Sequence, residues 1–198
     1  MRIHLIRHGE VENPDNLVYA DLQGFTLSAA GRRQAAAVAD RLRCLPLGAV
    51  VASPLDRAVA TATPIAAGGG CLVEVDERLT EWHLSKRWAG TRWKALPEVF
   101  PGELEAYMDH PFDLTFSPEP LAAVAARVSA AVQEWSTDYY YADVAFVSHQ
   151  DPIHAARRFL TNAGINDYHI DKPEHGSVST LERSGNGWSL TDYWAPPQ

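Results

Sequence analysis

Four consecutive residues near the start of the chain, Arg7-His8-Gly9-Glu10, have the chemistry of an anion site. They follow a short apolar run, residues 3–6, whose length is typical of a buried strand. Arginine presents a planar fork of donors to anionic oxygens, and histidine can act as a nucleophile or change its protonation near neutral pH. Glycine allows the backbone to approach a ligand closely. We therefore expect His8 to be the reactive side chain of the protein.

Two later segments show the same pattern of a strand followed by reactive side chains. The apolar run 49–52 precedes Arg57, and the apolar run 144–147 precedes His149. Both runs have the length of buried strands. In an open sheet of parallel strands, ligands bind outside the carboxyl ends of the strands. We therefore expect Arg57 and His149 to lie beside the arginine and histidine of the first segment.

Two arginines and two histidines at one edge of a sheet suit the transfer of a phosphoryl group. Arginine neutralises the phosphoryl oxygens bidentately and stays charged at any working pH. One histidine, neutral at its attacking nitrogen, can take the phosphoryl group, while a second, protonated histidine donates to its oxygens. The leaving oxygen then needs a proton, and Glu81 is the carboxyl group expected to give it. That role requires a pKa raised toward neutrality.

The elements that must position these side chains alternate between short apolar strands and helices. This alternation predicts a largely parallel sheet covered by helices on both faces. Ser28 should open a helix to about Arg43, and Ser53 and Pro54 should open the next one, which Pro64 should kink or end early. The other expected elements are strands over 72–75, 177–182 and 188–194, helices over 120–135 and 153–160, and turns at Gly68-Gly69-Gly70 and Gly185-Asn186-Gly187.

The least regular part of the chain, about residues 82–117, is predicted to be a small cap inserted into a single domain of residues 1–198. Its aromatic side chains either pack the cap together or line a pocket for an apolar or aryl leaving group. These aromatic residues are Trp82, Trp88, Trp93 and Tyr107. The same stretch also contains four cations, which are compatible with an acidic substrate, namely Lys86, Arg87, Arg92 and Lys94.

Composition restricts the partners of the protein. The chain has 198 residues and a formal net charge of −8 at pH 7, which argues against a nucleic-acid or anionic-membrane surface because both require a positive field. No apolar run is long enough to span a bilayer, and the N-terminus lacks the pattern of a signal peptide. Cys44 and Cys71 have neither metal nor redox spacing and are expected to be reduced thiols. We therefore expect a cytoplasmic protein.

Four segments, in this order, resemble the motifs of the histidine phosphatase superfamily, the phosphoglycerate mutase-like enzymes. The resemblance spans nearly the whole chain, and it implies a three-layer α/β/α sandwich that needs no metal or other cofactor. The segments are Arg7-His8-Gly9-Glu10, Ser53-Pro54-Leu55-Asp56-Arg57-Ala58 through Thr61-Ala62, Arg78-Leu79-Thr80-Glu81 and Val147-Ser148-His149. Weaker likenesses are Leu27-Ser28 with Gly31, Gln34 and Ala35, and Glu119 with Arg127.

The resemblance also implies roles for individual residues. His8 would be the phosphorylated nucleophile, and Arg7, Arg57 and His149 would bind the phosphoryl oxygens. Glu81 would be the general acid for the leaving group and then the base that activates water. The partner implied is a small phosphorylated substrate.

Three further residues are candidates for substrate binding, namely Asn13, Gly24 and Gln150. Asn16 competes with Asn13 for the position of the asparagine that usually follows the first motif of the family. Gln150 stands where a small glycine is common after the late histidine, so it can narrow the pocket or contact the substrate. The other histidines, His175 among them, are expected to be surface or packing residues.

Three alternatives accompany the predicted phosphatase. The stretch 82–90 lacks the pattern of the glycolytic mutases, so a phosphatase is favoured over a phosphoglycerate-type mutase. A module that binds a phosphate ligand without turnover is disfavoured because the reactive residues occur together. A metal site made by His149, Asp151 and His154 is disfavoured because Pro152 should start a helix between them and no second ligand cluster follows.

Overall fold

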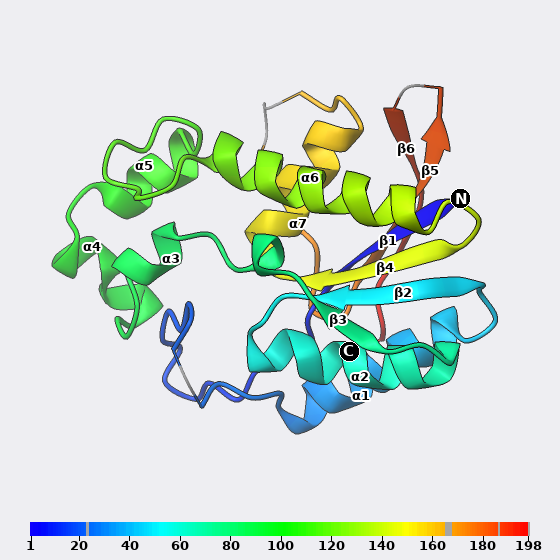
Figure 1. The fold of residues 1–198 in the computed structure, drawn as a ribbon. Helices are drawn as coiled ribbons and strands as arrows, with labels where there is room; N and C mark the ends of the chain where they lie inside the picture. Colours follow the sequence, from blue (N-terminus) through cyan, green and yellow to red (C-terminus); the bar gives the residue numbers. More distant parts are fainter. Residues whose placement is uncertain (23, 165–167, 186, 198) are drawn as a thin grey trace.

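The computed structural model describes residues 1–22, 24–164, 168–185 and 187–197. A six-stranded sheet forms its centre (Figure 1). The strands are β1 (Arg2–Arg7), β2 (Leu47–Ala52), β3 (Val73–Val75), β4 (Asp143–Ser148), β5 (Val178–Ser184) and β6 (Gly187–Trp194), in the spatial order β3-β2-β4-β1-β5-β6. Strands β1 to β4 are parallel, whereas β5 and β6 pair antiparallel at one edge. The prediction of a mostly parallel sheet is confirmed.

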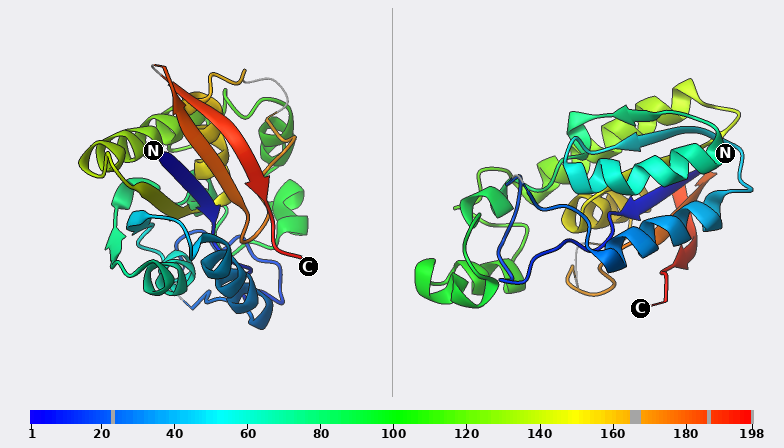
Figure 2. Two further views of the ribbon diagram at one scale, coloured as in Figure 1. Left: turned by 90° about the vertical axis from the view of Figure 1, so that its right-hand side faces the viewer. Right: turned by 90° about the horizontal axis from the view of Figure 1, so that it is seen from below.

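Helices cover both faces of the sheet (Figures 1 and 2). The long helices are α1 (Ala29–Leu42), α2 (Asp56–Gly69), α6 (Leu121–Asp138) and α7 (Gln150–Leu160). Because successive strand side chains point to opposite faces, Val51 and Phe146 pack with α6 and α7, while Val50 and Val147 pack with α1 and α2. The chain is therefore a three-layer α/β/α sandwich, as expected.

The predicted start of α2 is wrong. The helix begins at Asp56 after Leu55, and Ser53 lies outside it with a buried hydroxyl 2.8 Å from His149 Nε2. Sequence favours serine followed by proline as a helix start. Here the Ser53 hydroxyl instead contacts His149, a residue far away in the sequence.

The predicted early end of α2 is also wrong. The helix continues through Pro64 to Gly69, so of the three consecutive glycines only Gly70, with a φ of 70°, ends it. Ala62 and Ile65 are buried on either side of Pro64 in the core beneath the sheet. Their packing outweighs the cost of proline, about 3 kcal/mol in a helix interior.

The other predicted elements are present with shifted bounds. Ser28 caps α1 as expected, because its Oγ accepts a hydrogen bond from the Gly31 N–H at 3.0 Å. The helix expected over 120–135 continues to Asp138. Within the predicted last turn, Asn186 lies outside the described residues.

Short helices between β3 and α6 lie beyond the carboxyl ends of the parallel strands (Figure 1). They are the 3-10 helices η1 (Glu77–Leu79) and η2 (Trp93–Ala95) and the α-helices α3 (Leu84–Arg87), α4 (Leu96–Val99) and α5 (Glu103–Asp109). The buried side chains of Trp82, Trp88 and Tyr107 pack there against Leu121 of α6 and Ala155 of α7. We interpret residues 82–117, which exclude η1, as the inserted cap. Over the described ranges, every helix is too short or too polar to cross a bilayer.

A buried ionic cluster joins the amino ends of β1 and β4. Asp143 accepts hydrogen bonds from the Arg2 backbone N–H at 2.8 Å and from Arg2 Nε at 2.9 Å, and it lies 3.6 Å from His4 Nε2. Burial alone would raise the pKa of Asp143, but the interactions with His4 and Arg2 outweigh it and lower that pKa. The cluster therefore stabilises the charged carboxylate.

We predict that Asp143→Asn lowers the free energy of unfolding by about 2 kcal/mol at pH 7, because Arg2 loses its charged partner. A lowered folded-state pKa contributes stability above the unfolded pKa of about 4 and loses it as the pH falls further. Urea unfolding across pH 3 to 7 should show the difference in stability between wild type and variant begin to narrow below about pH 4. A gap that stays constant over this range would contradict the assignment.

Asp192→Asn is the matched control, since it breaks the exposed pair with Arg41 at 3.0 Å. This change should cost less than about 0.5 kcal/mol.

Candidate active site

The carboxyl ends of the central strands bring the predicted residues together. Arg7 pairs with Ser148 in the β1–β4 ladder, and the His8 N–H donates to the Ser148 carbonyl at 3.0 Å. The ring centroids of His8 and His149 are 5.1 Å apart. Arg57, from the first turn of α2, donates from Nε to His8 Nε2 at 3.2 Å. The expectation that these four side chains meet at one edge agrees with this arrangement.

His8 is held with its Nε2 lone pair facing the site. Its Nδ1 lies 2.8 Å from the Gly9 carbonyl, which can only accept, so Nδ1 carries the proton. Nε2 accepts from Arg57 and is therefore unprotonated. Burial, followed by the charges of Arg57 and Arg7, lowers the pKa of His8 well below its ordinary value. The imidazole is thus neutral and nucleophilic at Nε2.

Gly9 packs on protein backbone, whereas the sequence suggested that it would approach a ligand. A Cβ at Gly9 would lie 2.5 Å from the Gly31 carbonyl oxygen, and a Cβ at Gly31 would lie 2.0 Å from the Glu10 carbonyl oxygen. Ser28 Oγ also donates to the Glu10 carboxylate at 2.6 Å. The first turn of α1 therefore holds the loop that follows His8.

Arg57 is oriented by a loop whose role the sequence did not indicate. Its guanidinium carbon lies 4.7 Å from the centroid of the Tyr19 ring, a cation–π distance. Its Nη2 donates to the Ala20 carbonyl at 2.7 Å. Ala20 has a φ of 42°, which a residue with a Cβ rarely adopts. The surrounding structure thus holds a strained residue whose carbonyl fixes Arg57.

His175 is a second site residue that sequence reasoning missed, because we expected it at the surface or in packing. Its Nε2 accepts from Arg7 Nη2 at 2.7 Å, while Arg7 Nη1 donates to the Pro173 carbonyl at 2.9 Å. Burial and the Arg7 charge lower the pKa of His175 to about 3, so its ring is neutral and can accept. The only sequence signal was its position just before a closing strand.

His149 is buried and its Nε2 lies 2.8 Å from Ser53 Oγ. Burial, Arg57 and His8 lower the pKa of His149 well below its ordinary value, so the expectation of a protonated ring does not hold for the free site. The Ser53 hydroxyl can donate to Nε2, which leaves the proton of a neutral ring on Nδ1. Nδ1 lies 3.9 Å from Glu81 Oε2 and faces the site. A neutral His149 can therefore still donate to an oxyanion.

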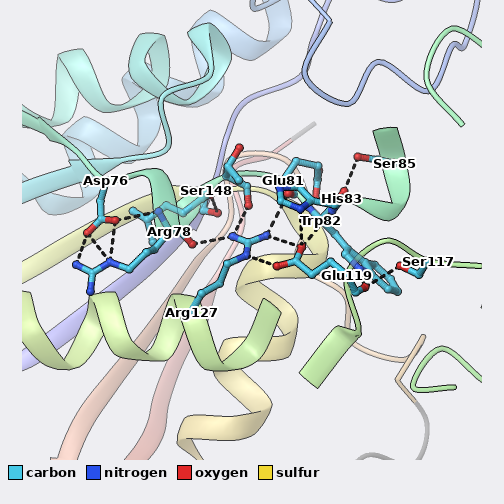
Figure 3. Close-up of polar contacts among 12 residues, drawn as sticks. Asp76, Arg78, Glu81, Trp82, His83, Ser85, Ser117, Glu119, Arg127 and Ser148 are labelled. Atoms are coloured by element: carbon cyan, nitrogen blue, oxygen red, sulfur yellow. Dashed lines mark hydrogen bonds and ion pairs between the residues drawn. The ribbon is translucent and has the colours of Figure 1, made fainter. Parts of the chain in front are cut away.

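Glu81 is carried by a segment that Arg127 of α6 clamps (Figure 3). Arg127 donates to the carbonyls of Arg78, Thr80 and Glu81 at 2.7, 2.8 and 3.1 Å. It also forms a two-point ion pair with Glu119, at 2.7 and 3.2 Å. These contacts give a structural reason for the weaker sequence likeness at the Glu119–Arg127 pair. The clamp fixes where the Glu81 side chain enters the site.

The Glu81 carboxyl is suited to give up a proton near neutral pH. Burial and the negative charge of Asp151 raise its pKa to about 7, against opposing effects of Arg57, the Trp82 N–H and Arg7. The side chain is 19% exposed, and that surface faces the site cavity. This carboxyl therefore meets the pKa requirement set out for a general acid.

A cavity of about 180 Å³ opens in front of His8 and Glu81, and Gln150 lies on its wall. Asn13 does not border this cavity. Its side chain bonds the backbone of Leu17 at 2.9 and 3.0 Å and borders a neighbouring hollow instead. Gly24, with a φ of 86°, is in a loop turn and is not part of the cavity wall. The structure thus brings Gln150 to the reactive residues and leaves Asn13 and Gly24 apart from them.

The disfavoured metal ligands have separate surroundings. His149 faces Ser53, Asp151 pairs with Lys172 at 2.8 Å, and His154 lies 3.1 Å from Arg157. Across the described ranges, no three His, Cys, Asp or Glu side chains are grouped as metal ligands.

Comparisons with known proteins agree with the geometry. The family model of the histidine phosphatase superfamily (branch 1) matches residues 3–195. An uncharacterised Mycobacterium tuberculosis protein is 40% identical over 168 residues, which are 81% of this chain and 78% of that protein. Phosphoserine phosphatase 1 of Hydrogenobacter thermophilus is 30% identical over 183 residues, 91% of this chain and 86% of that enzyme.

A solved structure extends the likeness to the whole fold. The mycobacterial glucosyl-3-phosphoglycerate phosphatase, in complex with VO3, has a TM-score of 0.85 and 26% identity, and the match covers 98% of this chain and 99% of that one. The family resemblance predicted from the motifs is therefore confirmed. This chain belongs to the histidine phosphatase superfamily, and the phosphoserine and glucosyl-3-phosphoglycerate enzymes to which it is similar are named phosphatases.

Proposed function

We propose that this protein is a phosphatase that hydrolyses a small phosphate monoester through a phosphohistidine at His8. The observation that carries the proposal is the pairing, across one cavity, of a neutral His8 with a carboxyl group of raised pKa at Glu81. A nucleophile and an acid on either side of one phosphoryl group are the two groups that ester hydrolysis needs.

In the first step the His8 Nε2 lone pair attacks phosphorus as the bond to the leaving oxygen breaks. The electron pair of that bond goes to the leaving oxygen, which takes the proton of Glu81. Arg57 Nε donates to Nε2 in the free site, so it must release that nitrogen and donate to a phosphoryl oxygen instead. Arg7 and His149 Nδ1 supply further donors to the phosphoryl oxygens.

In the second step a water molecule attacks the phosphorus of phosphohistidine. The Glu81 carboxylate takes a proton from this water, and the N–P bond breaks with its electrons returning to Nε2. Inorganic phosphate leaves, and both side chains regain their starting protonation. The same carboxyl group thus acts first as acid and then as base.

From the relatives we carry over only the class of substrate, a phosphate monoester. Phosphoserine and glucosyl-3-phosphoglycerate, which appear in the relatives' names, are both phosphate monoesters. A mutase must also hold a second phosphoryl group. Among the described residues that line the cavity at His8 and Glu81, Arg7 is the only arginine or lysine, which supports the phosphatase over the mutase.

We predict that His8→Ala lowers kcat on p-nitrophenyl phosphate at least about 10⁴-fold, because no other side chain takes the phosphoryl group. Rapid quenching with ³²P-labelled substrate should trap an acid-labile phosphoenzyme in wild type and none in the variant. His110→Ala, at an exposed histidine of the cap, is the control and should keep both turnover and label. Label retained by His8→Ala would rule out this nucleophile.

Glu81→Gln should slow hydrolysis of alkyl phosphates about 10²- to 10⁴-fold and that of p-nitrophenyl phosphate far less, since only a poor leaving group needs the proton. Glu98→Gln, at an exposed carboxylate of α4, should match wild type.

The pH profile tests the same carboxyl group independently. Because a pKa of about 7 keeps Glu81 protonated below that pH, kcat/KM for an alkyl phosphate should fall as the pH rises through about 7. Glu81→Gln should abolish this fall in kcat/KM. A fall that persists in the variant would assign the acid to another group.

A further inference from the structure

The position of Glu81 identifies which hollow receives the leaving group. An acid must touch the leaving oxygen, and Glu81 lines the cavity that contains His8 and Arg7. Two other hollows border the site, one at Arg33 and one at Asn13, and Glu81 lines neither. If the proposed function holds, the group attached to the phosphate therefore occupies the Glu81 cavity.

The far wall of this cavity is aromatic and preformed. Trp82, Trp88, Trp93 and Tyr107 all line it. Trp88 packs edge-to-face against Trp93 and Tyr107, with ring centroids 6.2 and 5.7 Å apart. The cavity holds about 180 Å³, and about 150 Å³ is enough for a benzene ring. The walls and the volume thus suit one flat apolar ring.

The cations of the cap do not line this cavity. Lys86 pairs with Asp21 at 3.0 Å, Arg87 with Glu103 at 2.6 Å and Arg92 with Asp15 at 3.0 Å. Neither these three nor Lys94, the last of the cap cations, is part of the cavity wall. These four residues, which from sequence alone left an acidic substrate open, therefore give an acidic group no partner in this cavity.

Asp151 instead gives the wall a negative charge. It lines the cavity, while Lys172 lies outside the lining and donates to Asp151 Oδ1 at 2.8 Å. Tyr107 and Tyr168 donate to the same carboxylate at 3.3 and 3.2 Å. Of this ion pair, the carboxylate of Asp151 lines the cavity and Lys172 does not. Arg7 also lines the cavity, but in the proposed mechanism it binds the phosphoryl oxygens. An anionic leaving group would therefore be buried beside Asp151 without a counter-charge of its own, which is unfavourable.

We propose that the substrate's leaving group is uncharged and carries one aromatic or similarly flat ring, and that Asp151 excludes esters bearing a second anionic group. This inference rests on the proposed phosphatase function. It adds the substrate class and assigns Asp151 as the residue that determines specificity.

Phosphoglycolate and phosphoglycolamide test the charge requirement, because they match in size and differ by one negative charge. At pH 7 the amide should have at least about tenfold higher kcat/KM, since the carboxylate lacks a counter-charge. Benzyl phosphate should exceed ethyl phosphate by at least about tenfold through burial of the ring. Equal values within either pair would overturn the corresponding part of the inference.

Asp151→Asn tests the residue itself. The variant keeps an oxygen for Lys172 and Tyr168 but removes the charge, so the carboxylate-to-amide ratio of kcat/KM should rise about tenfold. The ratio cancels any effect on Glu81 that both substrates share. Asp21→Asn, which releases Lys86 in the same way, is the matched control and should leave the ratio unchanged. An unchanged ratio in Asp151→Asn, or a change in the control, would overturn the assignment.

Hydrolysis of p-nitrophenyl phosphate separates the two proposals. If this ester is not hydrolysed, the phosphatase function fails and the substrate class fails with it. If it is hydrolysed while phosphoglycolate is used as well as its amide, only the substrate class is overturned.

Discussion

The site depends on backbone hydrogen bonds that extend the parallel ladders one residue beyond the strands. The His8 N–H donates to the Ser148 carbonyl, and the Ser53 N–H donates to the Val147 carbonyl at 2.9 Å. These bonds place His8, Ser53 and His149 at the same height along the strands, although the three segments are far apart in sequence. A one-residue slip in either ladder would reverse the direction of these side chains. The packed core on both faces of the sheet prevents that slip.

The electrostatics of the site follow from burying positive groups together. Arg7 and Arg57 lower the pKa values of both histidines, and burial acts in the same direction. The Glu81 carboxyl group opposite them is only about half ionised at pH 7, because burial and Asp151 raise its pKa to about 7. The free site therefore carries an excess of positive charge. A phosphoryl dianion would balance this excess, which agrees with the proposed reaction.

The parts of the fold that were predictable are those decided by local pattern. Apolar runs of strand length, and the serine that caps α1, are short-range features. The runs correctly predicted that His8, Arg57 and His149 meet at one edge of the sheet. The errors arose where a long-range contact overrode a local preference. Ser53 has the local signature of a helix cap but bonds His149, and the packing of α2 carries the helix through Pro64.

The residues that escaped prediction belong to the loops around the site. His175 lies 168 positions from its partner Arg7, and no periodicity connects the two. Tyr19 and Ala20 orient Arg57 from a segment without regular structure, where sequence patterns carry little information. Such contacts depend on the path of the whole chain.

The cap packs on the ends of α6 and α7, whereas His8, Arg57 and His149 lie at the carboxyl ends of the strands. This division separates two evolutionary pressures within a small protein. Mutations among the aromatic residues of the short helices can remodel the leaving-group wall while the strand ladders stay intact. Substitutions in this segment can therefore change which substrates bind while the reaction stays the same.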